Sequence, residues 1–369
     1  MITRLDRITI KGFKTIRELD NFQPGQLTVL IGPNGAGKSN FLSFFRLLQP
    51  LSLGPDQFQR HVGQQGGASK LLLDGPSVTP TMDVKLYFLS DAGQIDYKFR
   101  LAYAADDNLI TDYERYRVEE GDQTGPASWR SLGAGHLGSR LKDFESKDET
   151  TIQIVKALLG MFPYHFHDTS MTSHLRRKAE IAKGGLFWPD GYNIAPFLYR
   201  LKRNKGQSYQ RIVETLRLIL PFFSDFYLEP DEDHLLLAWR ETESDQIFTA
   251  SQAADGMLRA IALVTLLLQP DETLPYLLII DEPELGLHPY AINIIGGLIR
   301  AASQKTQVIV ATQSPAFVDC FEPSDIVVVE REGRESTFRR LEDNEELSEW
   351  LEEYTLSELW EKNVIGGRP

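Results

Sequence analysis

Residues 29–40 read Val-Leu-Ile-Gly-Pro-Asn-Gly-Ala-Gly-Lys-Ser-Asn, an apolar run that passes directly into a glycine-rich turn ending in Lys38 and Ser39. This is the G-x-x-x-x-G-K-S/T pattern of a phosphate-binding loop, with Gly32 and Gly37 at its fixed ends. Glycines let backbone N–H groups approach a triphosphate closely, because no Cβ stands in the way. A helix that begins near Lys38 would add the positive end of its dipole to the same anion.

The pattern assigns a role to each part of the loop. We expect Lys38 to reach the β- and γ-phosphates of ATP and the Ser39 hydroxyl to bind Mg²⁺. The nucleotide-binding residues are Gly32, Pro33, Asn34, Gly35, Ala36, Gly37, Lys38, Ser39 and Asn40. A plain glycine-rich turn between a strand and a helix is the alternative interpretation of the same residues.

A second motif, far along the chain, supplies carboxylates for the same site. Residues 276–284 run Tyr-Leu-Leu-Ile-Ile-Asp-Glu-Pro-Glu, an apolar stretch typical of a strand buried on both faces. In an open parallel sheet, ligands bind at the carboxyl ends of the strands, which is where Asp281 and Glu282 fall. We expect Asp281 to bind Mg²⁺ and Glu282 to polarise the attacking water, since adjacent buried acids are unfavourable without such a task.

The composition is that of an ordinary globular protein. Of the 369 residues, 42% are hydrophobic and 25% charged, enough to bury a large core. The formal charge of −13 argues against a surface coated in positive charge for nucleic acid, although a local basic surface is compatible with it. Cys320 is the only cysteine, so no intrachain disulfide can form and a reducing compartment fits.

Two further observations predict a cytoplasmic protein that does not associate with a membrane. The amino terminus alternates apolar and charged residues and lacks the apolar core of a signal peptide. The longest apolar helix-like segment, 257–268, contains Arg259 and is too short to span a bilayer.

The hydrophobic patterns predict an α/β protein in which the nucleotide site is interrupted by a long insertion. We expect strands at 2–10 and 27–31, a helix at 39–49 and an antiparallel meander at 84–118. The segment 151–250 is mostly helical in pattern, and its scattered prolines exclude a long coiled coil. Beyond it we expect a helix from Met257, strands at 276–281, 307–311 and 326–330, and a helix at 290–303.

Several phrases resemble one group of nucleotide-binding proteins. GPNGAGKSN at 32–40 and DEPELGLHP at 281–289 resemble the ABC-type ATPases of the SMC, RecF and OLD group. Five further phrases resemble a bacterial family of small predicted SMC-like AAA family ATPases. They are YHFHDTS at 164–170, DGYNIAPFLYRL at 190–201, PFFSDFYLEP at 221–230, ATQSP at 311–315 and LWEKNVIGGRP at 359–369. The resemblance covers nearly the whole chain. It implies an ABC-type P-loop ATPase head with a mixed sheet, an antiparallel β subdomain and a helical insertion.

On this basis the chain divides into four parts. They are an N-terminal ATPase lobe with the meander (1–118), a loop and mostly helical insertion (119–250), a C-terminal ATPase lobe (251–340) and an acidic tail helix (341–369).

The resemblance also implies a homodimer with composite ATP sites, each formed by the phosphate loop of one subunit and the signature segment of the other. That segment is residues 251–259, Ser-Gln-Ala-Ala-Asp-Gly-Met-Leu-Arg, in which Asp255 and Gly256 would bind nucleotide. A helix amino terminus offers free N–H donors to a γ-phosphate across the interface. A simple helix cap by Asp255 is the alternative interpretation.

Three residues depart from the pattern of the group. Serine is usual where Ala254 stands, so a hydroxyl contact to the γ-phosphate is missing unless Ser251 substitutes. Gln313 replaces the switch histidine after strand 307–311, and we count it as catalytic because its amide can bind phosphate, although it cannot titrate near neutrality. His288 ends the dimer-contact loop in place of aspartate, and contact with the opposite subunit and plain packing are both open. Hydrolysis is therefore expected to be slow.

The adenine pocket and the glutamine loop are less well defined. Phe13 and Lys14 fall where this class approaches the base, but core packing explains Phe13 equally well. Gln64 and Gln65 are candidates for the glutamine loop.

Two other constellations have competing interpretations. His165 and His167 would share one face of a strand, as in some metal sites, or serve as hydrogen-bonded structural histidines. The segments 199–217 and 176–178 hold basic residues near aromatics, which suits nucleic-acid backbone, a solvated helix face or an acidic partner.

The sequence thus predicts a slow ATPase, converting ATP and water to ADP and phosphate with Mg²⁺, that acts as a dimerisation switch. The resemblance implies a role in phage defence (antiviral defence) or DNA maintenance beside an effector partner such as a Toprim-like nuclease, with nucleic acid as a further candidate partner. The rival hypothesis, motivated by Ala254 and Gln313, is a scaffold that holds ATP without turnover, or a nucleic-acid-binding module. A transporter motor fits poorly, and intrinsic nuclease activity has no support.

Overall fold

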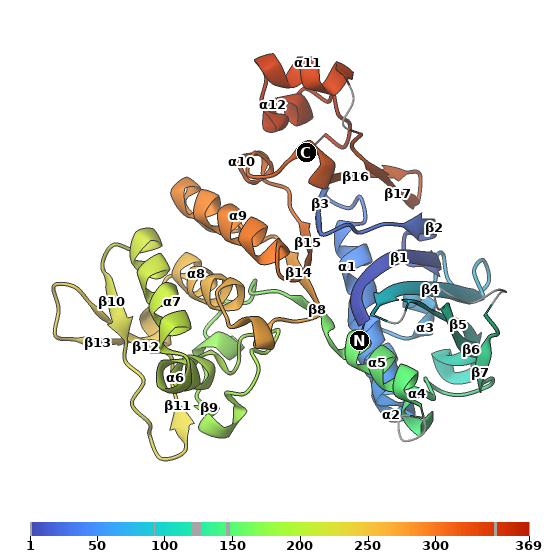
Figure 1. Ribbon diagram of the computed structural model, residues 1–369, viewed down its shortest axis with the longest axis horizontal. Helices are drawn as coiled ribbons and strands as arrows, with labels where there is room; N and C mark the ends of the chain where they lie inside the picture. Colours follow the sequence, from blue (N-terminus) through green and yellow to red (C-terminus); the bar gives the residue numbers. More distant parts are fainter. Residues whose placement is uncertain (1, 92, 120–126, 145–147, 343–344, 369) are drawn as a thin grey trace.

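The computed structural model describes residues 2–91, 93–119, 127–144, 148–342 and 345–368 (Figure 1). Two six-stranded sheets organise these residues, with strand orders β2-β1-β4-β5-β6-β7 and β17-β16-β3-β15-β14-β8. A three-stranded sheet, β10-β12-β13, and a two-stranded sheet, β11-β9, lie in the helical part of the molecule (Figure 1).

The first sheet is antiparallel throughout. Its strands are β1 (Ile2–Phe13), β2 (Ile16–Phe22), β4 (Thr81–Ser90), β5 (Gly93–Ala104), β6 (Asn108–Glu119) and β7 (Arg130–Gly133). Buried and half-buried residues alternate along β4, so one face of the sheet packs on the core and the other meets solvent. The predicted meander is confirmed, and the amino-terminal strands extend the same sheet.

The second sheet is mixed and brings distant parts of the chain together. Its strands are β3 (Leu27–Ile31), β8 (Met161–Tyr164), β14 (Leu277–Asp281), β15 (Gln307–Ala311), β16 (Ile326–Glu332) and β17 (Glu335–Arg340). All pairings are parallel except the one between β16 and β17 at the edge. Because β15 lies between β3 and β14 and is parallel to both, the phosphate loop after β3 and the paired acids at the end of β14 lie at the same carboxyl edge, one strand apart.

The second sheet separates two hydrophobic cores. Leu277 and Ile279 of β14 pack with α1 and the first sheet in one core. Leu278 and Ile280 point the other way, into a core shared with the helical part. Because side chains alternate along a strand, the unbroken apolar run of β14 serves both cores at once.

Helices cover the second sheet on both sides (Figure 1). On the side of the first sheet lie α1 (Lys38–Leu53), α2 (Pro55–Gln64), α3 (Ala68–Leu71), α4 (Leu141–Phe144) and α5 (Glu149–Leu159). On the other side lie α6 (Ile194–Asn204), α7 (Gly206–Ile219), α8 (Asp255–Leu267), α9 (Pro289–Ser303) and α10 (Pro315–Val318). Among the described residues, none of the helices combines the length and the apolar character needed to cross a bilayer.

The remaining strands are short, and the tail is not one helix. The small sheets consist of β9 (Ala179–Glu180), β10 (Phe223–Phe226), β11 (His234–Leu235), β12 (Ala238–Glu241) and β13 (Ile247–Thr249). The acidic tail forms α11 (Glu345–Glu353) and α12 (Leu356–Glu361). The fourfold domain division stays a prediction; its 119–250 part supplies β8, which pairs with β14.

Residues 365–367, which we call the C-terminal strap, pack against the start of the phosphate loop. The buried Trp360 donates its indole N–H to the Gly367 carbonyl. The Gly367 N–H in turn donates to Glu330 Oε1 of β16 at 2.8 Å. A Cβ at Gly367 would lie 2.5 Å from a methyl group of Val328 and 3.5 Å from Gly32 Cα, so the approach requires glycine.

Candidate nucleotide-binding site

The phosphate loop is shaped by its neighbours as well as by its own sequence. Gly32 has φ 146°, and a Cβ there would lie 2.1 Å from the Val329 carbonyl oxygen of β16. Gly37 has φ 118°, and a Cβ there would lie 2.0 Å from Ser336 Oγ of β17. Ser336 Oγ donates to the Ala36 carbonyl at 2.6 Å. Glycine is therefore required at both fixed positions by close packing against β16 and β17, a constraint that the motif alone did not reveal.

Lys38 begins α1 and is 5% exposed. Its ammonium group donates to two carbonyls of its own loop, Gly32 O at 2.5 Å and Pro33 O at 3.1 Å. Burial lowers the pKa of Lys38 to about 8, and the carboxylates of Glu282 and Asp281 oppose that shift. A buried cation near these acids can neutralise phosphate charge at short range.

Ser39 and Asp281 meet although they are far apart in the chain. Burial raises the pKa of the Asp281 carboxyl, and the nearby Ser39 side chain opposes that shift. His167 Nε2 lies 3.0 Å from the Asp281 carbonyl oxygen. One hydroxyl and one buried carboxylate, together with phosphate oxygens, form a donor set that Mg²⁺ accepts. These residues therefore fit a magnesium nucleotide, and Ser39 and Asp281 would hold the ion.

Glu282 and Gln313 also come together. Glu282 has φ 43°, in the left-handed region, and its N–H donates to the Ala311 carbonyl of β15 at 2.8 Å. The Gln313 side-chain amide donates to Glu282 Oε1. Glu282 and Gln313, two of the three residues that we predicted to be catalytic together with Lys38, thus form a hydrogen-bonded pair at the carboxyl edge of the sheet.

Glu284 is a site residue that sequence reasoning missed. It is 8% exposed, and burial raises the pKa of its carboxyl. Its Oε1 accepts from Thr312 Oγ1 at 2.5 Å and from the Gln313 N–H at 3.3 Å. Glu284 thereby holds the segment that carries Gln313. The available signal was a third acid one proline beyond the pair, in DEPE at 281–284.

The signature segment presents an uncapped helix amino terminus. The first helical residue of α8 is Asp255, and the N-cap residue Ala254 makes no side-chain cap. The Met257 and Leu258 N–H groups donate to the Ala254 carbonyl at 3.1 and 3.2 Å. The interpretation of Asp255 as a simple cap is therefore wrong, and the first-turn N–H groups carry no side-chain acceptor from the N-cap. The predicted nucleotide contacts of Asp255 and Gly256 stay predictions.

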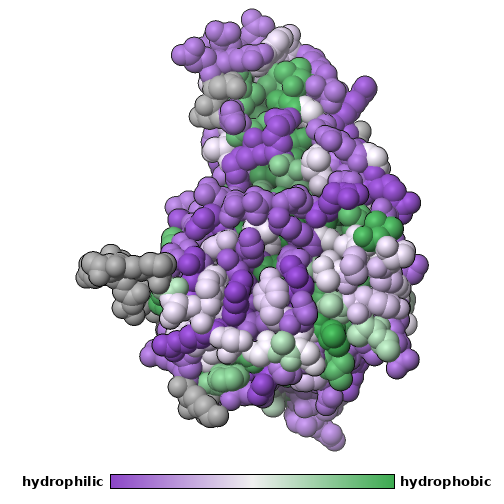
Figure 2. Space-filling view, turned by 90° about the vertical axis from the view of Figure 1, so that its right-hand side faces the viewer, coloured by the Kyte–Doolittle hydropathy of each residue, from purple (hydrophilic) through white to green (hydrophobic). Residues whose placement is uncertain are grey.

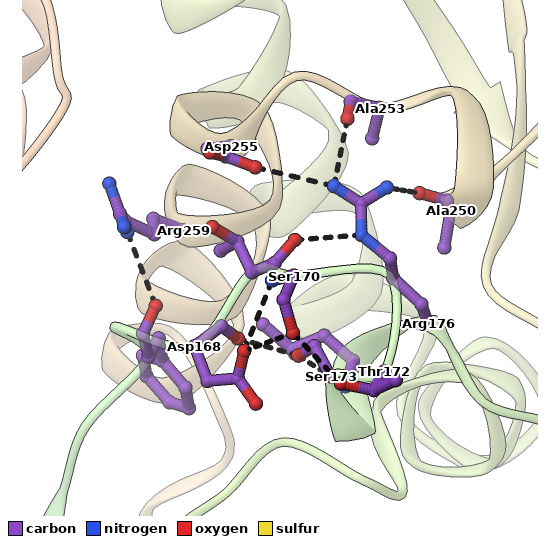
Figure 3. Close-up of polar contacts among 12 residues, drawn as sticks. Asp168, Ser170, Thr172, Ser173, Arg176, Ala250, Ala253, Asp255 and Arg259 are labelled. Atoms are coloured by element: carbon purple, nitrogen blue, oxygen red, sulfur yellow. Dashed lines mark hydrogen bonds and ion pairs between the residues drawn. The ribbon is translucent and has the colours of Figure 1, made fainter.

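Arg176 braces this segment (Figure 3). Its side chain is 6% exposed, and its guanidinium group donates to the Thr169 carbonyl at 2.9 Å and the Ala253 carbonyl at 3.1 Å. It also donates to the Ala250 carbonyl and pairs with Asp255 at 3.3 Å. Arg176 was one of the basic residues considered for nucleic-acid binding, but its guanidinium group is occupied by contacts within the protein.

Arg259 and Gly256 join the start of α8 to the loop at Leu285 and Gly286. Arg259 of α8 donates to the His167 carbonyl at 3.0 Å and to the Leu285 carbonyl at 3.2 Å. A Cβ at Gly256 would lie 2.4 Å from the Gly286 carbonyl oxygen. The start of α8 and the segment after Glu284 are therefore packed with no room for a side chain at position 256.

His288 is the N-cap of α9, where its Nδ1 accepts from the Tyr290 N–H at 3.3 Å. Its structural role is therefore a helix cap rather than packing, and contact with an opposite subunit stays a prediction.

The adenine and glutamine-loop candidates are not brought to the phosphate loop by any contact among the described residues. Phe13 is fully buried and packs edge-on against Phe44 at 5.7 Å, which supports the core interpretation. Lys14 donates to Ser43 Oγ of α1 at 2.9 Å. Residues 64–65 are exposed at the end of α2.

The paired histidines lie beyond their predicted strand, because β8 ends at Tyr164. The rings of His165 and His167 are 6.3 Å apart and nearly perpendicular, and burial lowers the pKa of His165 to about 4. Within the described residues, no group of three or more His, Cys, Asp and Glu side chains is arranged to hold a metal. In the basic segment, Lys202 pairs with Asp225 at 3.3 Å.

Comparison with known proteins agrees with this geometry. Residues 27–319 match the family described as AAA domain, putative AbiEii toxin, Type IV TA system. The chain belongs to this AAA family. Its fold is that of an SMC head: it is similar to the SmcHead bound to the C-winged helix domain of ScpA, with TM-score 0.61, 15% identity and coverage of 94% of this chain and 99% of that one.

Three further similarities point the same way. The Smc head domain with an extended coiled coil from Pyrococcus furiosus gives TM-score 0.55 at 16% identity, over 96% of this chain and 99% of that one. Structural maintenance of chromosomes protein 3 of Saccharomyces cerevisiae is 51% identical over 47 residues, which is 12% of this chain and 4% of that protein. Chromosome partition protein Smc of Delftia acidovorans is 50% identical over 44 residues, again 12% and 4%. The chain thus matches only a small part of these curated relatives.

Proposed function

We propose that this AAA family protein is an ATPase that binds ATP with Mg²⁺ and hydrolyses it slowly to ADP and phosphate. The observation that carries the proposal is the convergence of the phosphate loop with the end of β14, where Asp281 interacts with both Lys38 and Ser39. It joins two motifs that have no reason to meet in a plain glycine-rich turn, and it places Lys38 within reach of the same carboxylates. An SMC-like fold supports the same conclusion.

Each residue has a defined task in this proposal. The loop N–H groups and Lys38 bind the phosphates, and Ser39 and Asp281 orient the metal, which supplies charge neutralisation when it is bound. Glu282 orients a water molecule and accepts its proton. Gln313 holds the Glu282 carboxylate through their hydrogen bond.

The hydrogen bond between Gln313 and Glu282 favours slow turnover, and it is also compatible with the hypothesis of a scaffold that holds ATP without hydrolysis. The Glu282 oxygen that accepts from the Gln313 amide is less available to take a proton from water. If the Glu282–Gln313 contact persisted with nucleotide bound, the protein would hold ATP with little hydrolysis. Phosphate release with and without DNA separates the two hypotheses.

We further propose a homodimer in which the uncapped start of α8 faces the nucleotide of the opposite subunit. Arg176 and Arg259 support this by fixing that helix end from two sides, which pre-organises the N–H donors of Asp255 and Gly256. Dimerisation would then depend on ATP. The description of the family as a putative toxin supports a cytoplasmic role in phage defence, or in DNA maintenance, beside an effector such as a Toprim-like nuclease.

Glu282→Gln tests the assigned base. The variant should bind ATP with parental affinity, release phosphate far more slowly and accumulate as an ATP-bound dimer in sedimentation velocity. Glu352→Gln on the exposed part of α11 is the matched control and should behave like the parent. Hydrolysis by Glu282→Gln at the parental rate would remove Glu282 from the mechanism.

A further inference from the structure

The solvent-facing side of the first sheet carries a row of positive charges. Lys85 of β4 lies directly opposite Lys98 of β5, which lies directly opposite Arg115 of β6. We call these three residues the cationic row. Strands in a sheet are about 4.8 Å apart, so the row is a compact line of like charge about 10 Å long. Figure 2 shows this side of the molecule, with hydrophilic bands beside bands of intermediate hydropathy.

Such a row is unfavourable for the folded protein by itself. Like charges directly opposite on neighbouring strands are destabilising. Burial lowers the pKa of Lys98, and the charge of Lys85 lowers it further. In the described part of the chain, none of the three cations forms an ion pair with an acid. Asp96 offsets part of the charge at Lys98, but three cations in line on an open face still suit an anionic ligand outside the chain.

Aromatic rings hold the cations at the surface. The Trp129 ring has Lys98 Nζ 4.4 Å and the guanidinium carbons of Arg115 and Arg117 4.8 Å from its centroid. On the other side of the row, Lys98 Nζ lies 6.0 Å from the Tyr87 centroid. Cation–π contacts of this kind fix long side chains that would otherwise be mobile, so less entropy is lost when an anion binds.

Flanking cations are balanced differently. Arg100 pairs with Asp83 at 2.8 Å, and Arg117 pairs with Asp96 at 2.7 Å. Those acids neutralise the flanks and leave the cationic row as a positive strip between them. In a chain with a formal charge of −13, the strip is a local reversal of sign. The negative remainder of the protein would restrict a polyanion to this strip.

We propose that the cationic row, with Trp129 beside it, binds the phosphate backbone of double-stranded nucleic acid. The flat sheet offers no helix to enter a groove, so contacts fall on phosphates and are independent of sequence. Duplex is favoured over single strands because the Trp129 and Tyr87 rings are already covered by cations and do not present free faces for unpaired bases. An acidic protein partner is the alternative that the experiment must exclude.

The test compares two triple variants that remove the same number of positive charges. Lys85→Gln, Lys98→Gln and Arg115→Gln together remove the cationic row. Lys202→Gln, Arg203→Gln and Arg211→Gln together remove the rival basic surface of α6 and α7. Binding of a short mixed-sequence duplex DNA is measured by filter binding without nucleotide, as salt rises from about 50 to about 200 mM. Matching single-stranded DNA and polyglutamate serve as competitors.

The parent should bind duplex more tightly than single strands or polyglutamate. Each lost phosphate contact reduces the salt slope by about 0.9, so the row variant should lose a slope of about 3, and the α6–α7 variant should keep the parental slope. The row variant should stay folded with a thermal unfolding midpoint close to that of the parent, because the loss of cation–π contacts offsets the removal of like-charge repulsion. Unchanged duplex binding by the row variant, an equal loss in the α6–α7 variant, or a preference for polyglutamate would overturn the proposal.

This inference can fail independently of the proposed ATPase. Binding is measured without ATP, and the row lies on the solvent face of the first sheet rather than at the carboxyl edge of the second. The row variant should therefore release phosphate at the parental rate in the absence of DNA.

Discussion

Arg176 offers the most direct test of how the signature segment is held. The substitution Arg176→Met keeps most of the apolar stem and removes every donor of the guanidinium group. Three backbone carbonyls, those of Thr169, Ala250 and Ala253, then lose a charged donor. We expect the segment that precedes α8 to open locally while the rest of the fold persists.

The size of the effect follows from these contacts. A hydrogen bond to a charged group contributes about 1.5–3 kcal/mol, but partly buried carbonyls recover water, so about 1 kcal/mol for each of the three is a fair value. The ion pair with Asp255 adds little, because that carboxylate is 62% exposed. The sum is about 3 kcal/mol, or about two orders of magnitude in the equilibrium for local opening.

Hydrogen–deuterium exchange measures this opening directly. Amides of residues 250–258 should lose about a hundredfold protection in Arg176→Met, whereas those of β14 should not change. ATP turnover should fall while nucleotide affinity of the single subunit stays near the parental value. Arg177→Met is the matched control, since that exposed side chain donates only to the Thr172 carbonyl. Equal protection in Arg176→Met and the parent would refute the bracing role.

Two further predictions concern single atoms of the site. Gly256→Ala should displace the loop at Gly286, because its Cβ would lie 2.4 Å from the Gly286 carbonyl oxygen. ATP turnover in a phosphate-release assay should fall, while the affinity of the single subunit for ATP should not change. Gly297→Ala in α9 is the control and should not change turnover, because a Cβ there meets nothing within 4 Å. The pKa of Lys38 is about 8 in the folded protein and 10.5 in the unfolded chain, so the unfolded chain binds more protons between these pH values. The free energy of unfolding of the nucleotide-free protein should therefore rise by about 1.4 kcal/mol for each unit of increasing pH in this range. Thermal unfolding of Lys38→Met should lack that gain, and an identical rise in both proteins would contradict the assignment.

The parts of the fold that the sequence predicted best are the continuous apolar runs. β3 spans the predicted 27–31, and β14 lies within the predicted 276–281, because strands buried on both faces leave an unbroken hydrophobic signal. The strand predicted to carry His165 and His167 is instead β8, which ends just before them at Tyr164; it has four residues and contains Pro163, which suits its place at the edge of the sheet. Short edge strands carry too little pattern to be separated from the helical segment around them.

The site likewise contains residues that local motifs predict and residues that depend on distant segments. Backbone geometry near Lys38 and Asp281 is encoded in local motifs, so their convergence could be predicted. The roles of Arg176 and Glu284 depend on carbonyls and N–H groups supplied by distant segments, which no spacing rule reveals. The cationic row depends on strand register, and a shift of one residue would separate its charges.

The C-terminal strap gives the protein a built-in optical probe. Trp360 is buried, its indole N–H is bonded to Gly367, and Gly367 packs against the first glycine of the phosphate loop. Indole emission is sensitive to hydrogen bonding and to the polarity around the ring. Any rearrangement of Gly32 on nucleotide binding should therefore reach Trp360 through one intervening residue. Once the other four of the five tryptophans are replaced by phenylalanine, the emission wavelength of Trp360 would report the state of the loop without an added dye.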